Sequence, residues 1–110
     1  ELAVMEKENY SDRAWELGYY TLEMANRMSQ SEFMALGEEM MKTAKQVSQG
    51  GPMNTQQEIY DAYNRCLRLM SYLQAVEEMG IISSSEYRNL EIQILALTNQ
   101  IQTMYKNAQC

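Results

Sequence analysis

Two arginines on one predicted helix, Arg65 and Arg68, are the side chains whose spacing could most directly support chemistry. Three residues make almost one helical turn, so both guanidinium groups would lie on one side of the helix and could hold an anion. Basic residues of other predicted helices could complete such a site: Lys42, Lys45 and Arg88. Acids close in sequence could neutralise the arginines: Glu58, Asp61 and Glu91. We expect surface salt bridges here, and a small helical enzyme is an alternative that requires an enclosed polar pocket.

The adjacent carboxylates are poorly placed for acid–base chemistry or metal binding. Glu38 and Glu39, like Glu77 and Glu78, are neighbours on predicted helices, where consecutive side chains point about 100° apart. The chain contains no histidine. This excludes Ser-His and Cys-His nucleophile pairs, an imidazole base and the Glu-x-x-His ligands of di-iron bundles. The sequence therefore predicts a protein that is not an enzyme, with no catalytic residue, metal or cofactor.

The charge and the two cysteines restrict partners and location. Fifteen acidic and nine basic residues give a net charge of −6, whereas nucleic-acid binders usually carry a basic excess. Cys66 and Cys110 form no disulfide framework, which favours a reduced, cytoplasmic protein. No apolar run approaches the roughly 18–20 residues of a membrane span, and residues 6–9 interrupt any signal-like stretch. We expect neither a membrane nor a nucleic acid as partner.

Tyrosine and methionine are abundant, with eight and ten copies respectively. Tyr63, Tyr87, Met40 and Met70 fit the apolar stripes expected to form the core. Other copies fall at the flanks of these stripes or outside them, and a monomer of this size has little reason to expose so many large side chains. Both residue types suit protein interfaces, although wide stripes in a monomer are an alternative. The predicted interface residues are Tyr19, Tyr20, Met24, Met41, Tyr60, Tyr72 and Met79.

Helices must position these side chains, because good helix formers dominate and no run of alternating β-branched residues occurs. Breaks lie at Gly50-Gly51-Pro52, at Gly80 with the following serines, and more weakly at Ser29-Gln30-Ser31. One domain, residues 1–110, is expected, and residues 1–10 either extend the first helix or form an arm. The predicted helices are 11–29, 31–49, 55–79 and 84–106. The simplest arrangement that buries the apolar stripes of all four helices is an all-α, up-down-up-down antiparallel four-helix bundle.

Capping patterns mark the last two helices most clearly. Thr55 with Glu58 and Ser83 with Glu86 have the spacing of capping boxes, and Gly80 supplies a left-handed residue at a helix end. Ile81 and Ile82 are expected to plug the turn that follows. The last helix then carries one continuous apolar stripe: Tyr87, Leu90, Ile94, Leu97, Ile101 and Met104.

The first two predicted helices are less regular. The first is expected to place on one face Ala14, Gly18, Leu22, Ala25 and Met28, with Trp15 and Tyr19 beside them. The second carries Phe33, Leu36, Met40, Ala44 and Val47. Glu38 and Lys42 form an i,i+4 pair with favourable orientation, and Gly37 on the stripe indicates a close approach between helices.

Residues 73–87 and the helix after them resemble a family of small bacterial four-helix-bundle proteins found in intervening sequences of ribosomal RNA genes. Gly80 and Ser83 match the family's turn, and the last helix matches at Tyr87, Leu90, Ile94 and Ile101. The family is similar to the accessory variability protein (Avd) of diversity-generating retroelements. The resemblance implies an antiparallel bundle assembled as a ring, commonly a pentamer, whose accessory members bind nucleic acid and a reverse transcriptase. The family's paired arginines at the end of helix two are absent here.

Taken together, these features predict a non-enzymatic helical assembly or adaptor protein that forms a homo-oligomer and binds a protein partner through Tyr/Met-rich helix faces. An acidic inhibitor or immunity-type protein, possibly phage-borne, that blocks a basic or nucleic-acid-binding surface is a rival. That rival needs a contiguous acidic face, yet residues 1–55 carry nine acids and five bases, and residues 56–110 six acids and four bases. An exported helical domain of a longer secretion or conjugation protein is a further alternative.

Overall fold

The computed structural model describes residues 2–50 and 53–109, and these form an all-α four-helix bundle. The second helical rod is built from three consecutive segments, the middle one a π-helical turn (η1). Part of the predicted Gly50-Gly51-Pro52 break lies outside the described residues, as does Cys110. The elements are α1 (Leu2–Ala25), α2 (Gln30–Glu32), η1 (Phe33–Gly37), α3 (Glu38–Gln49), α4 (Gln56–Glu78) and α5 (Ser84–Gln109).

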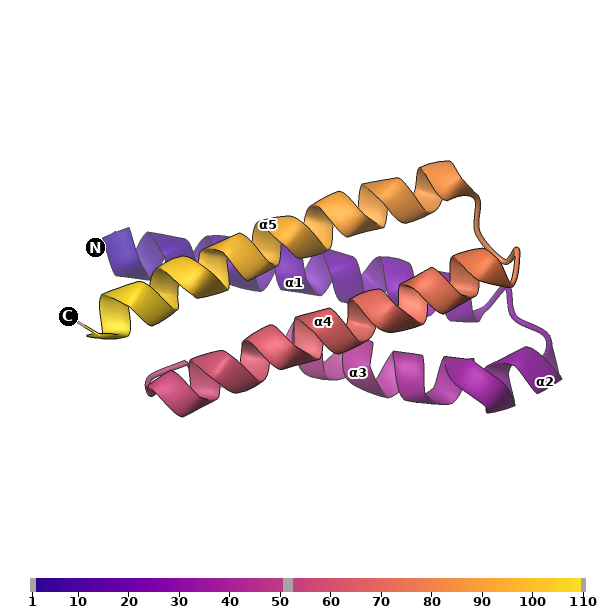
Figure 1. Ribbon diagram of the computed structural model, residues 1–110, viewed down its shortest axis with the longest axis horizontal. Helices are drawn as coiled ribbons and strands as arrows, with labels where there is room; N and C mark the ends of the chain where they lie inside the picture. The colour runs from indigo at the N-terminus through magenta and orange to yellow at the C-terminus, as the bar shows by residue number, and fades with distance from the viewer. Residues whose placement is uncertain (1, 51–52, 110) are drawn as a thin grey trace.

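Consecutive rods run in opposite directions along the long axis of the molecule (Figure 1). The described residues form an elongated body of 46 × 24 × 18 Å. α1 packs against α3 and α5, and α4 packs against the same two helices from the other side. Each rod therefore has two neighbours, and the side of each rod that points away from the bundle axis has no partner within the described chain.

Reciprocal capping fixes where three helices begin. The predicted boxes are confirmed: Thr55 Oγ1 accepts the Glu58 amide at 3.1 Å while Glu58 Oε1 accepts the Thr55 amide at 3.0 Å. Ser83 and Glu86 exchange equivalent bonds at 3.1 and 3.3 Å. A third box joins Ser29 to Glu32, so the second rod starts at Gln30 rather than residue 31. Glu86 also pairs with Arg27 Nη1 at 2.7 Å, linking the end of α1 to the start of α5.

The core runs the length of the bundle. Cys66, Leu69, Leu73 and Val76 of α4 are fully buried. All six predicted stripe residues of α5 are buried too, as expected from their spacing of three and four. Gly80 adopts φ +79° between α4 and α5, as predicted.

The expected plug under the α4–α5 turn is present: Ile82 is buried and Ile81 packs against the core. The core therefore continues beneath this turn and closes that end of the bundle.

α1 differs most from the sequence expectation. It spans Leu2–Ala25, so residues 2–10 extend the helix, which was one of the two alternatives for that segment, and the helix ends sooner than the predicted residue 29.

Most of the predicted inner face of α1 is confirmed, since Ala14, Gly18 and Ala25 are buried and Met28 packs against the core. Leu22 was wrongly placed on that face and is 42 % exposed, whereas Leu17, Thr21 and Met24 point inward. The Thr21 hydroxyl is satisfied within the helix by donating to the Leu17 carbonyl at 2.8 Å, which makes its burial inexpensive.

Two glycines allow close approaches in the first half of the chain. A Cβ on Gly18 would lie 2.6 Å from Ser48 Cβ, so the backbones of α1 and α3 approach more closely there than any larger residue allows. Gly37 is buried in η1, but the atoms nearest its missing Cβ are the Met28 sulfur at 2.7 Å and the Phe33 ring at 2.8 Å. The close contact at Gly37 is thus with side chains.

The predicted Glu38–Lys42 pair is replaced by Glu39–Lys42, whose charged atoms lie 3.9 Å apart. Both side chains are more than 60 % exposed, so the pair stabilises α3 only slightly.

Candidate functional site

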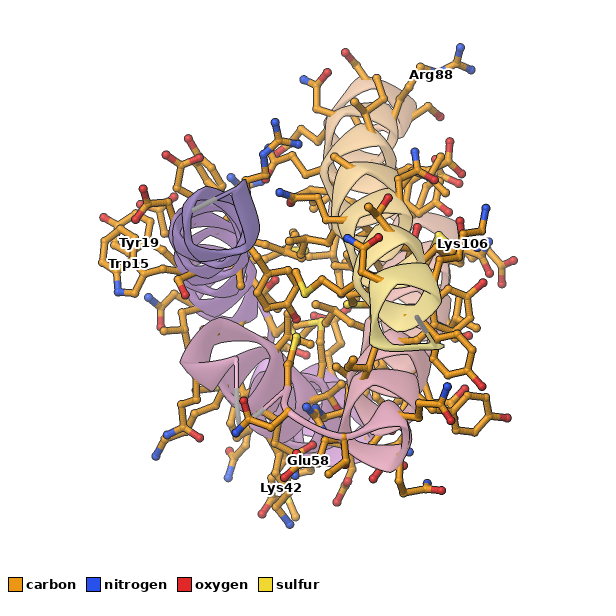
Figure 2. The ribbon with its side chains drawn as sticks, turned by 90° about the vertical axis from the view of Figure 1, so that its left-hand side faces the viewer. Trp15, Tyr19, Lys42, Glu58, Arg88 and Lys106 are labelled. Atoms are coloured by element: carbon orange, nitrogen blue, oxygen red, sulfur yellow. The ribbon has the colours of Figure 1, made fainter. Side chains whose placement is uncertain are left out.

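An aromatic cluster lies on the exposed surface of α1, with Trp15 and Tyr19 on the side without a neighbouring helix and Tyr20 at the edge that faces α5. Trp15 is 62 % exposed, Tyr19 49 % and Tyr20 45 %. The rings of Trp15 and Tyr19 stack with centroids 5.7 Å apart and planes at 14°, and Tyr20 meets Tyr19 edge-on at 6.1 Å. Figure 2 shows Trp15 and Tyr19 pointing away from the other helices. We call Trp15, Tyr19 and Tyr20 the α1 aromatic cluster.

The α1 aromatic cluster arises from helical spacing. Trp15, Tyr19 and Leu22 follow the i, i+4, i+7 pattern of an apolar stripe, and they lie opposite the buried stripe of Leu17 and Thr21. α1 is therefore apolar on two sides, of which the bundle covers one. Stacking pre-orders the exposed rings, so little side-chain entropy remains to be lost on binding.

Charge beside the α1 aromatic cluster is acidic. The hydrogen bond between the Tyr19 hydroxyl and Glu23, together with the negative charge of that carboxylate, raises the pKa of Tyr19. At neutral pH the phenol stays protonated and its hydroxyl donates to Glu23. Tyr19 and Glu23 lie one helical turn apart on α1, so their hydrogen bond helps to hold the Tyr19 ring against Trp15.

The predicted interface residues do not gather on one surface. Tyr19 and Tyr20 lie in the α1 aromatic cluster, whereas Met41 of α3 and Tyr72 of α4 are half-buried and pack against the core. Tyr60 of α4 is 54 % exposed, and Met79 at the end of α4 is 43 % exposed.

Met24 requires a correction, because it is 3 % exposed and belongs to the core. It follows Leu17 by two helical turns, so the inward orientation of Leu17 carries Met24 inward as well.

Several exposed apolar residues were missing from the predicted interface. Trp15 and Leu22 lie beside Tyr19, and the others are scattered over η1 and α5: Met34, Ile92 and Leu95. Spacing alone could have identified Trp15 and Leu22, since they continue the stripe through Tyr19. Met34 of η1 is 71 % exposed, and it lies off the predicted stripe of Phe33, Leu36 and Met40.

Of the two arginines of α4, only Arg65 lies near a buried polar pair, Tyr10 and Cys66. The Tyr10 hydroxyl and the Cys66 thiol are hydrogen-bonded inside the core, and the charge of nearby Arg65 acts on both. Burial raises the pKa of Cys66 to about 11 and raises that of Tyr10 as well. Arg65 is half-buried and Arg68 exposed.

Three surface grooves are lined by residues other than these arginines. One lies between α4 and α5, with a volume of about 520 Å³, and contains Tyr60. The other two lie between α1 and α5, at about 510 and 240 Å³, and include Tyr20 and Arg13 respectively. Within residues 2–50 and 53–109, no three His, Cys, Asp or Glu side chains converge as a metal site would require.

Comparison with family models, curated proteins and solved structures finds no match to this chain. Among the described residues, no helix has both the length and the apolar character needed to span a bilayer.

Proposed function

We propose that this protein is a non-enzymatic, cytoplasmic assembly protein that associates with a second copy of itself through the α1 aromatic cluster. The observation that carries this proposal is the stacked, outward-facing pair of Trp15 and Tyr19 on a helix side that no other helix covers, with Tyr20 edge-on to Tyr19 at the border of the α1–α5 groove. Aromatic side chains of this kind are the usual anchors of protein interfaces.

The exposed area of the three aromatic rings supports a dimer contact. Scaled by their exposed fractions, the three rings present about 350 Å² to solvent. Two copies would bury about 700 Å² from the rings alone. Leu22 and the polar residues around the rings would bring the total toward the roughly 1,200 Å² of the smaller stable interfaces.

Charge favours antiparallel packing of the two α1 helices. A parallel pair would place Asp12 against Asp12 and Glu23 against Glu23. An antiparallel pair centred on Tyr19 instead places Asp12 opposite the uncharged Asn26 of the second copy. The contact is then a closed two-fold interface. Because each copy carries a net charge of −6, added salt should strengthen the association by screening repulsion.

Multi-angle light scattering across a concentration series tests this proposal. The wild-type chain should show a mass above the 12.8 kDa of one copy, and the double variant Trp15→Glu/Tyr19→Glu should return it to one copy. The control Met34→Glu/Leu95→Glu adds the same charge at exposed apolar positions on other elements, and it should assemble as the wild type does. A wild type that stays at one copy at every concentration, or a control that disassembles equally, would refute the proposal.

A further inference from the structure

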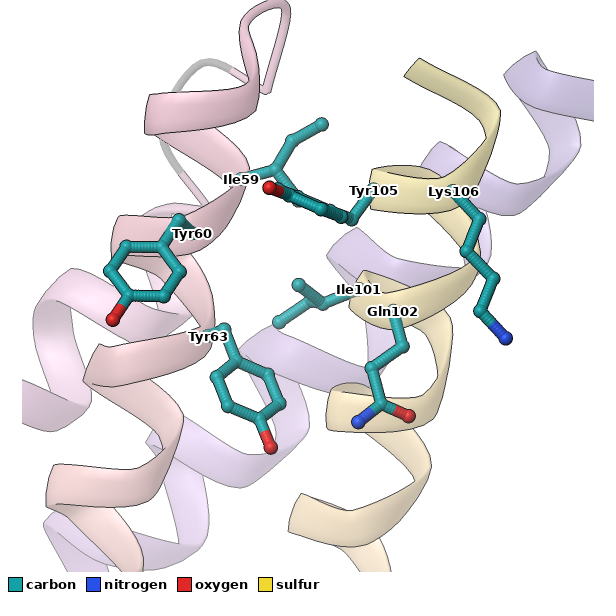
Figure 3. Close-up of a pocket in the computed structure, with 7 residues that line it drawn as sticks. All are labelled: Ile59, Tyr60, Tyr63, Ile101, Gln102, Tyr105 and Lys106. Carbon is teal, nitrogen blue, oxygen red and sulfur yellow. The ribbon is translucent and has the colours of Figure 1, made fainter. Parts of the chain in front are cut away.

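Two of the three surface grooves meet along the line where α1 packs against α5. Ile92 and Gln93 line both of them, so the hollows of about 510 and 240 Å³ form one continuous α1–α5 groove. On α1 it runs from Arg13 to Arg27, which is about 21 Å at the rise of an α-helix and matches a helix of about 14 residues. The third, the α4–α5 groove, is walled by tyrosines and has no carboxylate among its lining residues (Figure 3).

The floor of the α1–α5 groove is apolar. Met24 and Leu90 line it and are only 3 % and 6 % exposed, so they form its base. Tyr20 of α1 and Ile92 of α5 stand at its edges, 45 % and 59 % exposed, and Ala96 continues the apolar lining along α5. An amphipathic helix that laid its apolar face on this floor would cover both exposed side chains, as in helix-in-groove recognition.

The charges that line the α1–α5 groove do not cancel. Five ionised residues contribute to the lining: Arg13, Glu16, Glu23, Arg27 and Glu86. Arg27 and Glu86 pair with each other at 2.7 Å. Among the described residues, no ion pair engages Glu16, Glu23 or Arg13, so two carboxylates remain against one guanidinium group.

The rim of the groove on α1 is acidic. Asp12 precedes Glu16 by four residues and Glu23 follows it by seven, so the three carboxylates lie on one side of the helix over about 16 Å. All three side chains are exposed. The net charge of −6 on the chain adds a longer-range attraction for a basic partner.

The opposite rim, on α5, is neutral. Its only charged lining residue is Glu86, which is already paired with Arg27. Residues 92–105 contain no acidic or basic side chain, a stretch of about four helical turns. A helix lying in the groove would therefore meet carboxylates along one flank and neutral side chains along the other.

We propose that the α1–α5 groove binds a basic amphipathic helix of another protein. The apolar face of that helix covers Tyr20 and Ile92, and lysines or arginines along one flank face the three carboxylates of α1. Charge selects this occupant, because an acidic helix or a second copy of this chain would bring like charge to the same rim. The site is separate from the proposed self-association, since neither Trp15 nor Tyr19 lines the groove.

Titration with a designed peptide, followed by backbone amide shifts in NMR spectra, tests this site. The peptide is an alanine-rich helix of about 14 residues with leucines on one face, lysines along one flank and glutamines along the other. Saturable shifts should be concentrated in residues 13–27 and 86–96. The same peptide with glutamate in place of lysine should bind about tenfold more weakly or worse. Added salt should weaken binding of the lysine peptide, whereas it should strengthen self-association.

Charge variants of the protein test the acidic rim. Glu16→Gln/Glu23→Gln should weaken binding of the lysine peptide about fivefold, as expected for two exposed ion pairs. Glu38→Gln/Glu78→Gln makes the same change in net charge at exposed positions on α3 and α4, so it should leave the affinity nearly unchanged.

A second pair of variants tests the apolar contact. Ile92→Ala should weaken binding about fivefold, because it removes apolar surface that the peptide buries. Leu95→Ala removes a side chain of similar size and exposure one turn later on α5, outside the groove, and should have little effect.

The proposal is overturned if the lysine peptide shifts no groove amide at about 1 mM, or if the glutamate peptide binds as tightly. It is equally overturned if either groove variant weakens binding no more than its control. Shifts in residues 86–96 that develop when the protein is concentrated without peptide would assign the groove to a second copy and contradict the proposal as well.

Discussion

Replacing Gly18 by alanine should destabilise the bundle, although alanine is the better helix former. The new Cβ would lie 2.6 Å from Ser48 Cβ and 3.3 Å from the Ala44 carbonyl oxygen, whereas carbon atoms in contact prefer about 3.5–4.0 Å. α1 and α3 would have to separate by about 1 Å. Overpacking costs about 1–3 kcal/mol, and a carbon–carbon distance about 1 Å too short lies in the upper part of that range, at about 2–3 kcal/mol, while helix propensity returns about 1 kcal/mol. We therefore expect a net loss of about 1–2 kcal/mol.

Urea denaturation followed by far-UV circular dichroism measures this loss, and Ser48→Gly supplies the matched background. Because Ser48→Gly removes the atom nearest the new Cβ, Gly18→Ala should be neutral or stabilising in that background. The coupling between the two positions should reach about 1 kcal/mol or more. A Gly18→Ala protein that is as stable as the wild type, or an equal loss in both backgrounds, would refute the close α1–α3 contact.

Three further changes test the turn, a cap and the core by urea denaturation. Gly80→Ala should cost about 1–2 kcal/mol of stability and Gly80→Asn less. The space around Gly80 is open, so the only cost of a side chain is the backbone strain at φ +79°. Equal stability of both variants and the wild type would contradict this. Thr55→Ala should cost about 1 kcal/mol through loss of its cap on α4, and Thr55→Ser should be nearly neutral; an equal effect of both would argue against the cap. For Cys66, burial raises the thiol pKa from 9.0 to about 11, so its contribution is complete below pH 9 and is lost as pH rises toward 11. The free energy of unfolding should fall by about 2 kcal/mol more over that range in the wild type than in Cys66→Ala, and parallel pH profiles would contradict the assignment.

Much of the second half of the chain could be predicted from local pattern. The Thr55 and Ser83 caps, the left-handed Gly80 and the α5 stripe depend on residues within a few positions of one another, and helix signals at that range are strong. Ser29 was missed as a cap because the first predicted helix was extended to residue 29 and the second was expected to begin only at residue 31.

α1 could not be predicted as well, because its sequence offers two apolar stripes. Leu17 with Thr21 competes with Trp15, Tyr19 and Leu22, and a threonine on the buried stripe makes it look the more polar of the two. Only packing against α3 and α5 decides between them. The close approach of Gly18 to Ser48 excludes a bulky residue on that side, so α1 turns Leu17 inward and leaves the aromatic rings outside. The α4–α5 groove escaped prediction for a similar reason, since it joins Tyr60 and Tyr105 from distant parts of the chain.

Trp15 is the only tryptophan, so its fluorescence reports directly on the surface proposed to assemble. Emission and acrylamide quenching should be measured on the wild type across the concentration range used for light scattering. The proposal predicts that emission shifts to shorter wavelength and quenching falls over the same concentrations at which the mass rises above one copy. A rising mass with emission that stays typical of a solvent-exposed tryptophan would place the contact elsewhere and contradict the proposed role of the α1 aromatic cluster.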